Sequence, residues 1–251
     1  MNETTESNGV DSSRPIGVIA RMVGTFISPG RTFASLNQQV GHWDWLIPLI
    51  VMAIVAMISA YIIMPITQTG ARDATPEHVQ KDATLSEEQQ ARVQESMEKA
   101  GSIAVVVLAP IGAAASLFVQ AAIFLALANF ILGGSGNYKK TITVASYSTL
   151  VGIPGAIVTL PLMLAKGSLN VQVGPGLLLP TSMEGSYIYH VLTMVNLFSI
   201  WQYSLVVIGL GIIADVPTKR TACGVFGLWI VYVLIAAAVQ GLFGNVTGGA
   251  G

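Results

Sequence analysis

The sequence predicts an all-α, polytopic membrane protein with five transmembrane helices. Of its 251 residues, 53% are hydrophobic and only 10% are charged, with a mean hydropathy of +0.66. Soluble domains are about 25% charged, so a soluble fold of this composition could not cover its surface. Five apolar runs without Asp, Glu, Lys or Arg each reach the length of about 20 residues that crosses the hydrocarbon core. Because lipid offers no partners to backbone polar groups, these runs predict helices.

The five runs define a membrane domain over residues 42–244. We expect the spans at 45–65, 103–132, 141–165, 187–214 and 222–243. Pro154 and Pro161 lie inside the third run, so this helix is expected to kink or break. A polar tail at 1–14 is expected to be disordered, and a Gly-containing tail at 245–251 is expected to be flexible.

A charged segment over residues 85–101 precedes the second run. Its Glu and Lys/Arg residues alternate at helical spacing, which is typical of a solvated extramembrane helix. Gly101 is the only helix breaker between this segment and the second run. We therefore expect the second span to continue into a helix that projects from the membrane and bends near Pro110.

Basic residues in the short connections predict the orientation. Lys139, Lys140, Lys219 and Arg220 lie in two short loops, and Lys and Arg in short loops are retained on the cytoplasmic side. With five spans these loops share a side with the N-terminus. We therefore predict a cytoplasmic N-terminus and an external C-terminus, with the four basic residues acting as topology anchors.

The segment over residues 15–41 is predicted to be amphipathic and interfacial. Ile16, Ile19, Val23 and Phe26 fall at helical spacing, and Arg21 lies off this stripe. A short helix of this kind can lie on the inner membrane surface with its apolar face in lipid. The alternative is a helix that packs on the protein's own spans.

The chemistry of the runs argues against several functional classes. Ionisable residues at mid-membrane mark ion pathways and proton relays, and none lies in the five runs. The three histidines, His42, His78 and His190, are scattered and predict no metal site, and the net charge of −1 does not indicate nucleic-acid binding. We expect no catalytic, cofactor-binding or metal-binding residues, and no enzymatic activity.

One short pattern resembles a catalytic motif. The sequence "GGSG" at 133–136 matches the G-x-S-G of rhomboid-type intramembrane serine proteases, with His190 as a conceivable partner of Ser135. The other rhomboid motifs have no counterpart. A flexible turn that ends a helix at glycine explains the same residues.

Polar side chains form a seam along the fourth run. Tyr189, Thr193, Asn196, Ser199 and Gln202 follow one another at steps of 4, 3, 3 and 3, which places them on one face of a continuous helix. Such residues form interhelical hydrogen bonds in membranes. The alternative is a pathway for a polar solute.

Three stretches resemble the Yip family of multi-pass membrane proteins, in its bacterial branch. They are "FISPGRTFASLN" at 26–37, "GGSGNYKKTITVASYSTLVGIPG" at 133–155 and "NLFSIWQYSLVVIGLGIIADVPTKRTA" at 196–222. The resemblance extends from about Phe26 to Phe243 and implies a five-span Yip-domain fold with a cytoplasmic N-terminus. Eukaryotic members are linked to Rab-type GTPases, but their Asp-Leu-Tyr-Gly-Pro element is missing here, which makes a GTPase partner doubtful.

The resemblance and the composition together predict a non-enzymatic scaffold or membrane-organising protein. The expected partners are the lipid bilayer and other membrane proteins or a second copy of the chain, without nucleic acid. The expected location is the bacterial cytoplasmic (inner) membrane. The alternative function is a small-solute permease or channel that uses the polar seam of the fourth span.

Overall fold

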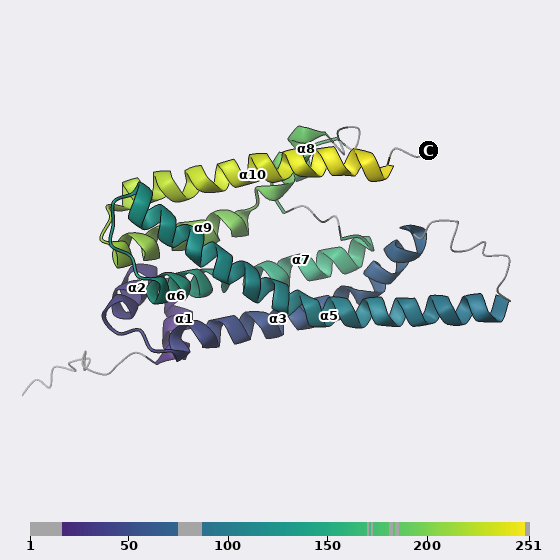
Figure 1. Cartoon of the computed structure of the whole chain (residues 1–251), viewed down its shortest axis with the longest axis horizontal. Coiled ribbons are helices and arrows are strands. Elements are labelled where there is room, and N and C mark those ends of the chain that lie inside the picture. Colours follow the sequence, from purple (N-terminus) through teal and green to yellow (C-terminus); the bar gives the residue numbers. More distant parts are fainter. Residues whose placement is uncertain are drawn as a thin grey trace, which may run out of the picture.

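The computed structural model describes residues 17–74, 87–169, 171, 173–180, 183 and 186–248. The tail predicted at 1–14 lies outside these residues. All elements in the described part of the chain are helical (Figure 1). They are α1 (Val18–Ile27), α2 (Pro29–Gln38), α3 (Trp43–Ala74), α5 (Glu87–Ala126), the π-helix η1 (Leu127–Ile131), α6 (Tyr138–Thr149), α7 (Gly152–Lys166), the 3-10 helix η2 (Pro175–Leu178), α8 (Tyr187–Met194), α9 (Leu197–Ala214) and α10 (Thr218–Gly248).

Five helical segments are long and apolar enough to cross a membrane, which confirms the predicted all-α, five-span fold class. These segments are Trp43–Thr67, Pro110–Ile131, Tyr138–Lys166, Leu197–Ala214 and Thr218–Gly241. Figure 1 shows them as a bundle of roughly aligned helices, with α1 and α2 at one end and the end of α10 at the other. From Glu87 on, the charged segment and the second span form one helix, α5, which contains Pro110 without ending there, and residues 85 and 86 lie outside the described residues. Towards the C-terminus, α10 stays helical as far as Gly248, which lies in the segment predicted as a flexible tail.

The third span is broken into α6 and α7 at Leu150 and Val151. Pro154 is the third residue of α7, where a missing backbone N–H costs little because the first turn has no helical acceptor for it. Further along a continuous helix the same proline would clash with the preceding turn. The chain therefore starts a new helix just before Pro154, whereas Pro161 is accommodated inside α7.

The prediction of one continuous span over 187–214 is wrong. The structure divides this run into α8 and α9 at Val195 and Asn196. Asn196 has extended backbone angles, and its side-chain oxygen accepts a 2.8 Å hydrogen bond from the backbone N–H of Ser199. This is an N-cap, which replaces the missing helical acceptor and starts α9. Only α9 is a membrane-length segment.

Helix α6 lies at the centre of the bundle. All residues from Thr141 to Ser148 are buried, and α6 packs against α3, α5 and α9. The hydroxyl groups of Thr141, Thr143, Ser146 and Ser148 each donate to a backbone carbonyl of the preceding turn, so a polar helix can be buried on all sides. Phe33 and Leu36 of α2 complete this core from outside the spans.

Candidate functional site

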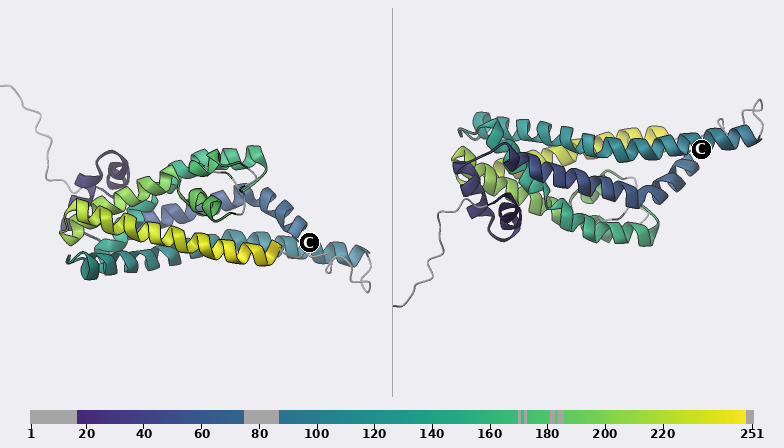
Figure 2. Two further views of the ribbon diagram at one scale, coloured as in Figure 1. Left: turned by 90° about the horizontal axis from the view of Figure 1, so that it is seen from above. Right: turned by 90° about the horizontal axis from the view of Figure 1, so that it is seen from below.

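Helix α1 is amphipathic, and the face that packs on the protein carries Arg21 and Thr25 together with Met22 and Phe26. Arg21 and Thr25 are 7% and 0% exposed, whereas Ile19 and Ile27 are both 76% exposed and Val23 is 53% exposed. Figure 2 shows α1 and α2 as a hairpin against the side of the bundle, near one end. Of the predicted apolar stripe, Ile19 and Val23 face away from the bundle, whereas Phe26 packs edge-on against Trp201 of α9. The placement of this segment in the membrane interface stays a prediction. Ile16 lies outside the described residues.

A buried ion pair fixes this hairpin. The guanidinium of Arg21 donates to Asp44 Oδ1 at 2.7 Å, and the other carboxylate oxygen accepts from the backbone N–H of Gly41 at 2.7 Å. Asp44 lies in the first turn of α3, so the bond joins α1 to the first span. Both side chains are less than a tenth exposed. The protein interior therefore screens the attraction between the Arg21 guanidinium and the Asp44 carboxylate only weakly, and loss of either partner is costly.

Tyr147 of α6 belongs to the same polar cluster. Its side chain is fully buried, and Arg21 and Asp44 both lie close enough to act on it electrostatically. The Tyr147 hydroxyl and Arg21 Nε have no hydrogen-bond partner within the part of the chain that the structure describes. The Arg21–Asp44 pair thus joins α1 to α3, and both of these helices also pack against α6.

The predicted topology anchors lie at one end of the bundle, which we call the basic end (Arg31, Lys139, Lys140, Lys219 and Arg220). Lys139 and Lys140 begin α6, and Lys219 and Arg220 begin α10 at the same end (Figure 1). Lys140 Nζ donates to Asn37 Oδ1 at 2.7 Å, and Asn37 Nδ2 donates to the carbonyl of Ile212 at 3.3 Å. Lys140 therefore also holds α2 to α6, in addition to its predicted anchoring role.

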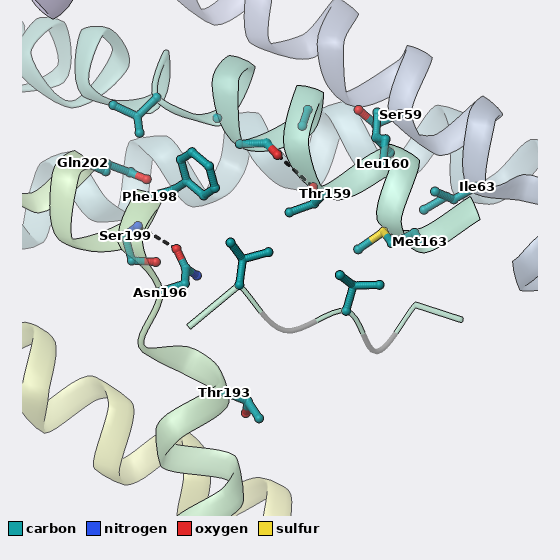
Figure 3. Close-up of a pocket in the computed structure, with 16 residues that line it drawn as sticks. Ser59, Ile63, Thr159, Leu160, Met163, Thr193, Asn196, Phe198, Ser199 and Gln202 are labelled. Atoms are coloured by element: carbon teal, nitrogen blue, oxygen red, sulfur yellow. Dashed lines mark hydrogen bonds between the residues drawn. The ribbon is translucent and has the colours of Figure 1, made fainter. Parts of the chain in front are cut away.

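A cavity of about 420 Å³ lies between α3, α7 and the break between α8 and α9 (Figure 3). We call it the α7–α9 cavity. Gly155 of α7 lies opposite Phe198 of α9, Gly152 lines the cavity one turn earlier, and the connection after α7 contributes Val171 and Val173. The remaining lining residues are Ser59, Ile63, Val151, Ala156, Thr159, Leu160, Met163, Thr193, Asn196, Ser199 and Gln202.

Four of the five predicted seam residues line this cavity. Thr193, Asn196, Ser199 and Gln202 do so, and Tyr189 does not. The expected single helical face does not exist, because the α8–α9 break separates Tyr189 and Thr193 from Ser199 and Gln202. The end of α8, the Asn196 cap and the first two turns of α9 nevertheless bring these four residues to the lining of one cavity. Their role as a solute-facing or interhelical seam stays a prediction.

A packed layer separates the cavity from the basic end. Val144, Tyr147, Leu150 and Val151 are at most 1% exposed, and they belong to the continuous core with Val206 and Leu210 of α9. Only Val151 of this layer borders the cavity. The cavity is therefore one-sided in this conformation and does not pass through the bundle.

Comparisons with known proteins decide the family. A family model described as the Yip1 domain matches residues 23–239, which is most of the chain. The chain belongs to the Yip1 family. It is also similar to "Membrane protein YknW" of Bacillus subtilis (strain 168), with 23% identity over 253 residues that cover 97% of this chain and all of the relative. No solved structure matches. The predicted resemblance is thus confirmed.

The Yip1 family is a non-enzymatic membrane family. The positions of the residues in the rhomboid-like pattern agree with this. Ser135 lies in the turn between η1 and α6, where its backbone N–H donates to Ala214 at the end of α9. His190 is in α8, towards the opposite end of the bundle (Figure 1). Ser135 and His190 are therefore not assembled into a dyad. In this Yip1-family chain, the described residues contain no group of three His, Cys, Asp or Glu side chains that could hold a metal.

Proposed function

We propose that this Yip1-family protein is a non-catalytic scaffold that organises the membrane, with the bilayer as its principal partner. Its basic end faces the cytoplasm at the bacterial inner membrane, and helix α1 lies in the inner leaflet. The observation that supports this proposal best is the packing of α1, with Arg21 buried on the protein and Ile19, Val23 and Ile27 facing outward.

The chemistry of α1 favours lipid over water around its outer face. Each buried large aliphatic side chain contributes about 1.5–3 kcal/mol relative to exposure in water, so three neighbouring ones supply a strong drive into the acyl region. The polar face is already occupied by the ion pair with Asp44. The basic end complements anionic headgroups beside the helix.

The depth of α1 can be measured directly. In a Cys223→Ser background, an environment-sensitive fluorophore is attached to Val23→Cys or to Gln38→Cys of α2, both of which are exposed positions. In proteoliposomes we expect the fluorophore at position 23 to be quenched by lipids brominated on the acyl chain. The fluorophore at position 38 should be quenched by aqueous iodide. Equal quenching of both positions by iodide would mean that α1 lies in water, and the proposal would fail.

The α7–α9 cavity favours a second candidate function, a small-solute permease. Gln202, Ser199 and Asn196 all present polar atoms to it, as a solute site between spans would require. Against this candidate stand the packed layer towards the basic end and the charge-free lining of the cavity. A permease would have to open that layer in a second conformation.

Osmotic swelling of proteoliposomes distinguishes the two functions. We expect vesicles that contain the native protein to swell in glycerol or urea no faster than protein-free vesicles, because the inner layer is packed. Faster swelling that is lost in Asn196→Leu/Gln202→Leu would favour the permease. Ser204→Ala is the matched control, since this α9 side chain bonds only its own helix at the Ile200 carbonyl. Circular dichroism checks that Asn196→Leu, which removes the cap of α9, still folds.

A further inference from the structure

We propose that the α7–α9 cavity is a binding site for a neutral amphipathic molecule. The polar group of this ligand binds the first two turns of α9, and its apolar body lies against α7 and α3. This inference does not rest on the scaffold function, because a bound amphiphile is compatible with either candidate function.

The polar wall carries hydrogen-bonding atoms that the protein leaves unused. Asn196 Nδ2, the Ser199 hydroxyl and the Gln202 amide lie at successive steps of three residues and line the cavity. None of them makes a side-chain hydrogen bond with the described residues beyond the cap that Asn196 Oδ1 forms. Together they offer donors and acceptors in one row, which suits a hydroxyl, ester or amide group.

The other hydroxyl groups around the cavity already donate their hydrogen atoms to helix carbonyl groups. Ser59 donates to the Val55 carbonyl at 2.7 Å, Thr159 to the Gly155 carbonyl at 2.9 Å, and Thr193 to the His190 carbonyl at 3.0 Å. These groups contribute little polarity to the ligand. The hydrogen-bond donors that remain unused are thus concentrated on the α9 wall.

The opposite wall is mainly apolar, with Ser59 and Thr159 as its two hydroxyl-bearing residues. Figure 3 places Ile63, Leu160 and Met163 across the cavity from Gln202, Ser199 and Asn196. Val171 and Val173 add further aliphatic surface. A flexible thioether such as Met163 adapts to chains of different shape. The segregation of polar and apolar walls matches a molecule with one polar end.

The charge of the lining selects a neutral ligand. None of the lining residues is Asp, Glu, Lys, Arg or His. An ionised group in the cavity would lose hydration without gaining a counter-charge, which is costly at membrane depth. The volume of about 420 Å³ lies in the range of about 300–1,000 Å³ that small-molecule sites occupy.

Photo-crosslinking in nanodiscs tests the proposal. The probe is a decanoylglycerol with a diazirine in its acyl chain, and the competitors are unlabelled 1-decanoylglycerol, decyl phosphate and decylammonium, which share the chain length and differ in charge. We expect labelled peptides from 152–163 and 196–202. Excess 1-decanoylglycerol should abolish the labelling. Decyl phosphate and decylammonium at the same concentration should leave the labelling unchanged.

Variants at the polar wall decide whether the site is specific. Ser199→Ala/Gln202→Leu removes two unused hydrogen-bonding groups and should reduce labelling about tenfold. Ser204→Ala, outside the cavity on the same helix, should label like the native protein. Thermal melting confirms that both variants are folded. Labelling spread evenly over the spans, unchanged in the double variant, or competed equally by the charged compounds would overturn the proposal.

Discussion

Asp44→Leu is expected to lower the stability of the protein sharply and to release the α1–α2 hairpin from the bundle. The substitution leaves the buried Arg21 guanidinium without its 2.7 Å partner, and breaking a buried pair in this way typically costs about 3–5 kcal/mol. The Gly41 backbone N–H also loses its acceptor. Thermal melting in detergent should show the loss. Protease cleavage between residues 18 and 42 should become faster, because the hairpin loses its link to α3.

Two controls separate the ion pair from general damage at Asp44. Arg31→Ala removes an exposed charge of the same hairpin and should change the melting temperature little, because exposed charges contribute about 0–1 kcal/mol. Arg21→Met/Asp44→Leu removes both charges and should recover much of the stability, since apolar replacement of a whole buried pair is often neutral. A double variant as unstable as Asp44→Leu would show that the pair is not what holds the hairpin.

Gly209→Leu is expected to prevent correct packing of the bundle. A Cβ atom at Gly209 would lie 2.5 Å from Val144 Cγ1 and 3.2 Å from Phe33 Cδ1, so α9 could not approach α6 and α2 as closely. Val144 and Phe33 are at most 1% exposed and have no space to move into. Overpacking of a core costs about 1–3 kcal/mol for small additions, and a whole leucine side chain should cost more. Expression level and size-exclusion profile report the defect.

Gly227 provides a matched control for this substitution. It lies in α10, and an added Cβ there would meet nothing within 4 Å. Gly227→Leu should therefore express and elute like the native protein. The smaller substitution Gly209→Ala places a single methyl group at the same position. Adding Val144→Ala to this variant should partly restore its expression level and elution profile, because it removes the atoms nearest the new methyl group. If Gly209→Leu behaved like Gly227→Leu, the close approach of α9 to α6 would be wrong.

The fold class could be predicted from the sequence because lipid imposes a simple rule. Long runs without charge must be helices that satisfy their own backbone, and five such runs are present. Hydropathy does not reveal caps, so the break at Asn196 was missed although Asn is a strong N-cap residue. The break at the third span was easier to anticipate, since Pro154 marks it directly.

The cavity was partly predictable and the ion pair was not. Polar residues at helical steps indicated Thr193, Asn196, Ser199 and Gln202, all of which line the cavity. The opposite wall comes from α3 and α7, whose approach no local pattern reports. Arg21 and Asp44 are 23 residues apart in the sequence. Asp44 lies just outside the first apolar run, beside Trp43 and Trp45, where its position is typical of a charged residue that flanks a membrane span. Its partner depends on how the hairpin turns at Pro29.

The amphipathic pattern of α1 was recognised, but the pattern alone does not say which face meets the protein. In a soluble protein the apolar face would be buried. In this structure Arg21 and Thr25 turn inward beside Met22 and Phe26, while Ile19, Val23 and Ile27 face outward.

The side of the membrane on which each turn lies tests the account most directly. In the Cys223→Ser background, single cysteines replace Lys219 at the basic end and Lys166 at the end of α7, both of which are exposed. With intact cells and a membrane-impermeant maleimide, the account predicts labelling of Lys166→Cys at once and of Lys219→Cys only after permeabilisation. Labelling of Lys219→Cys in intact cells, or of both positions from one side, would contradict it.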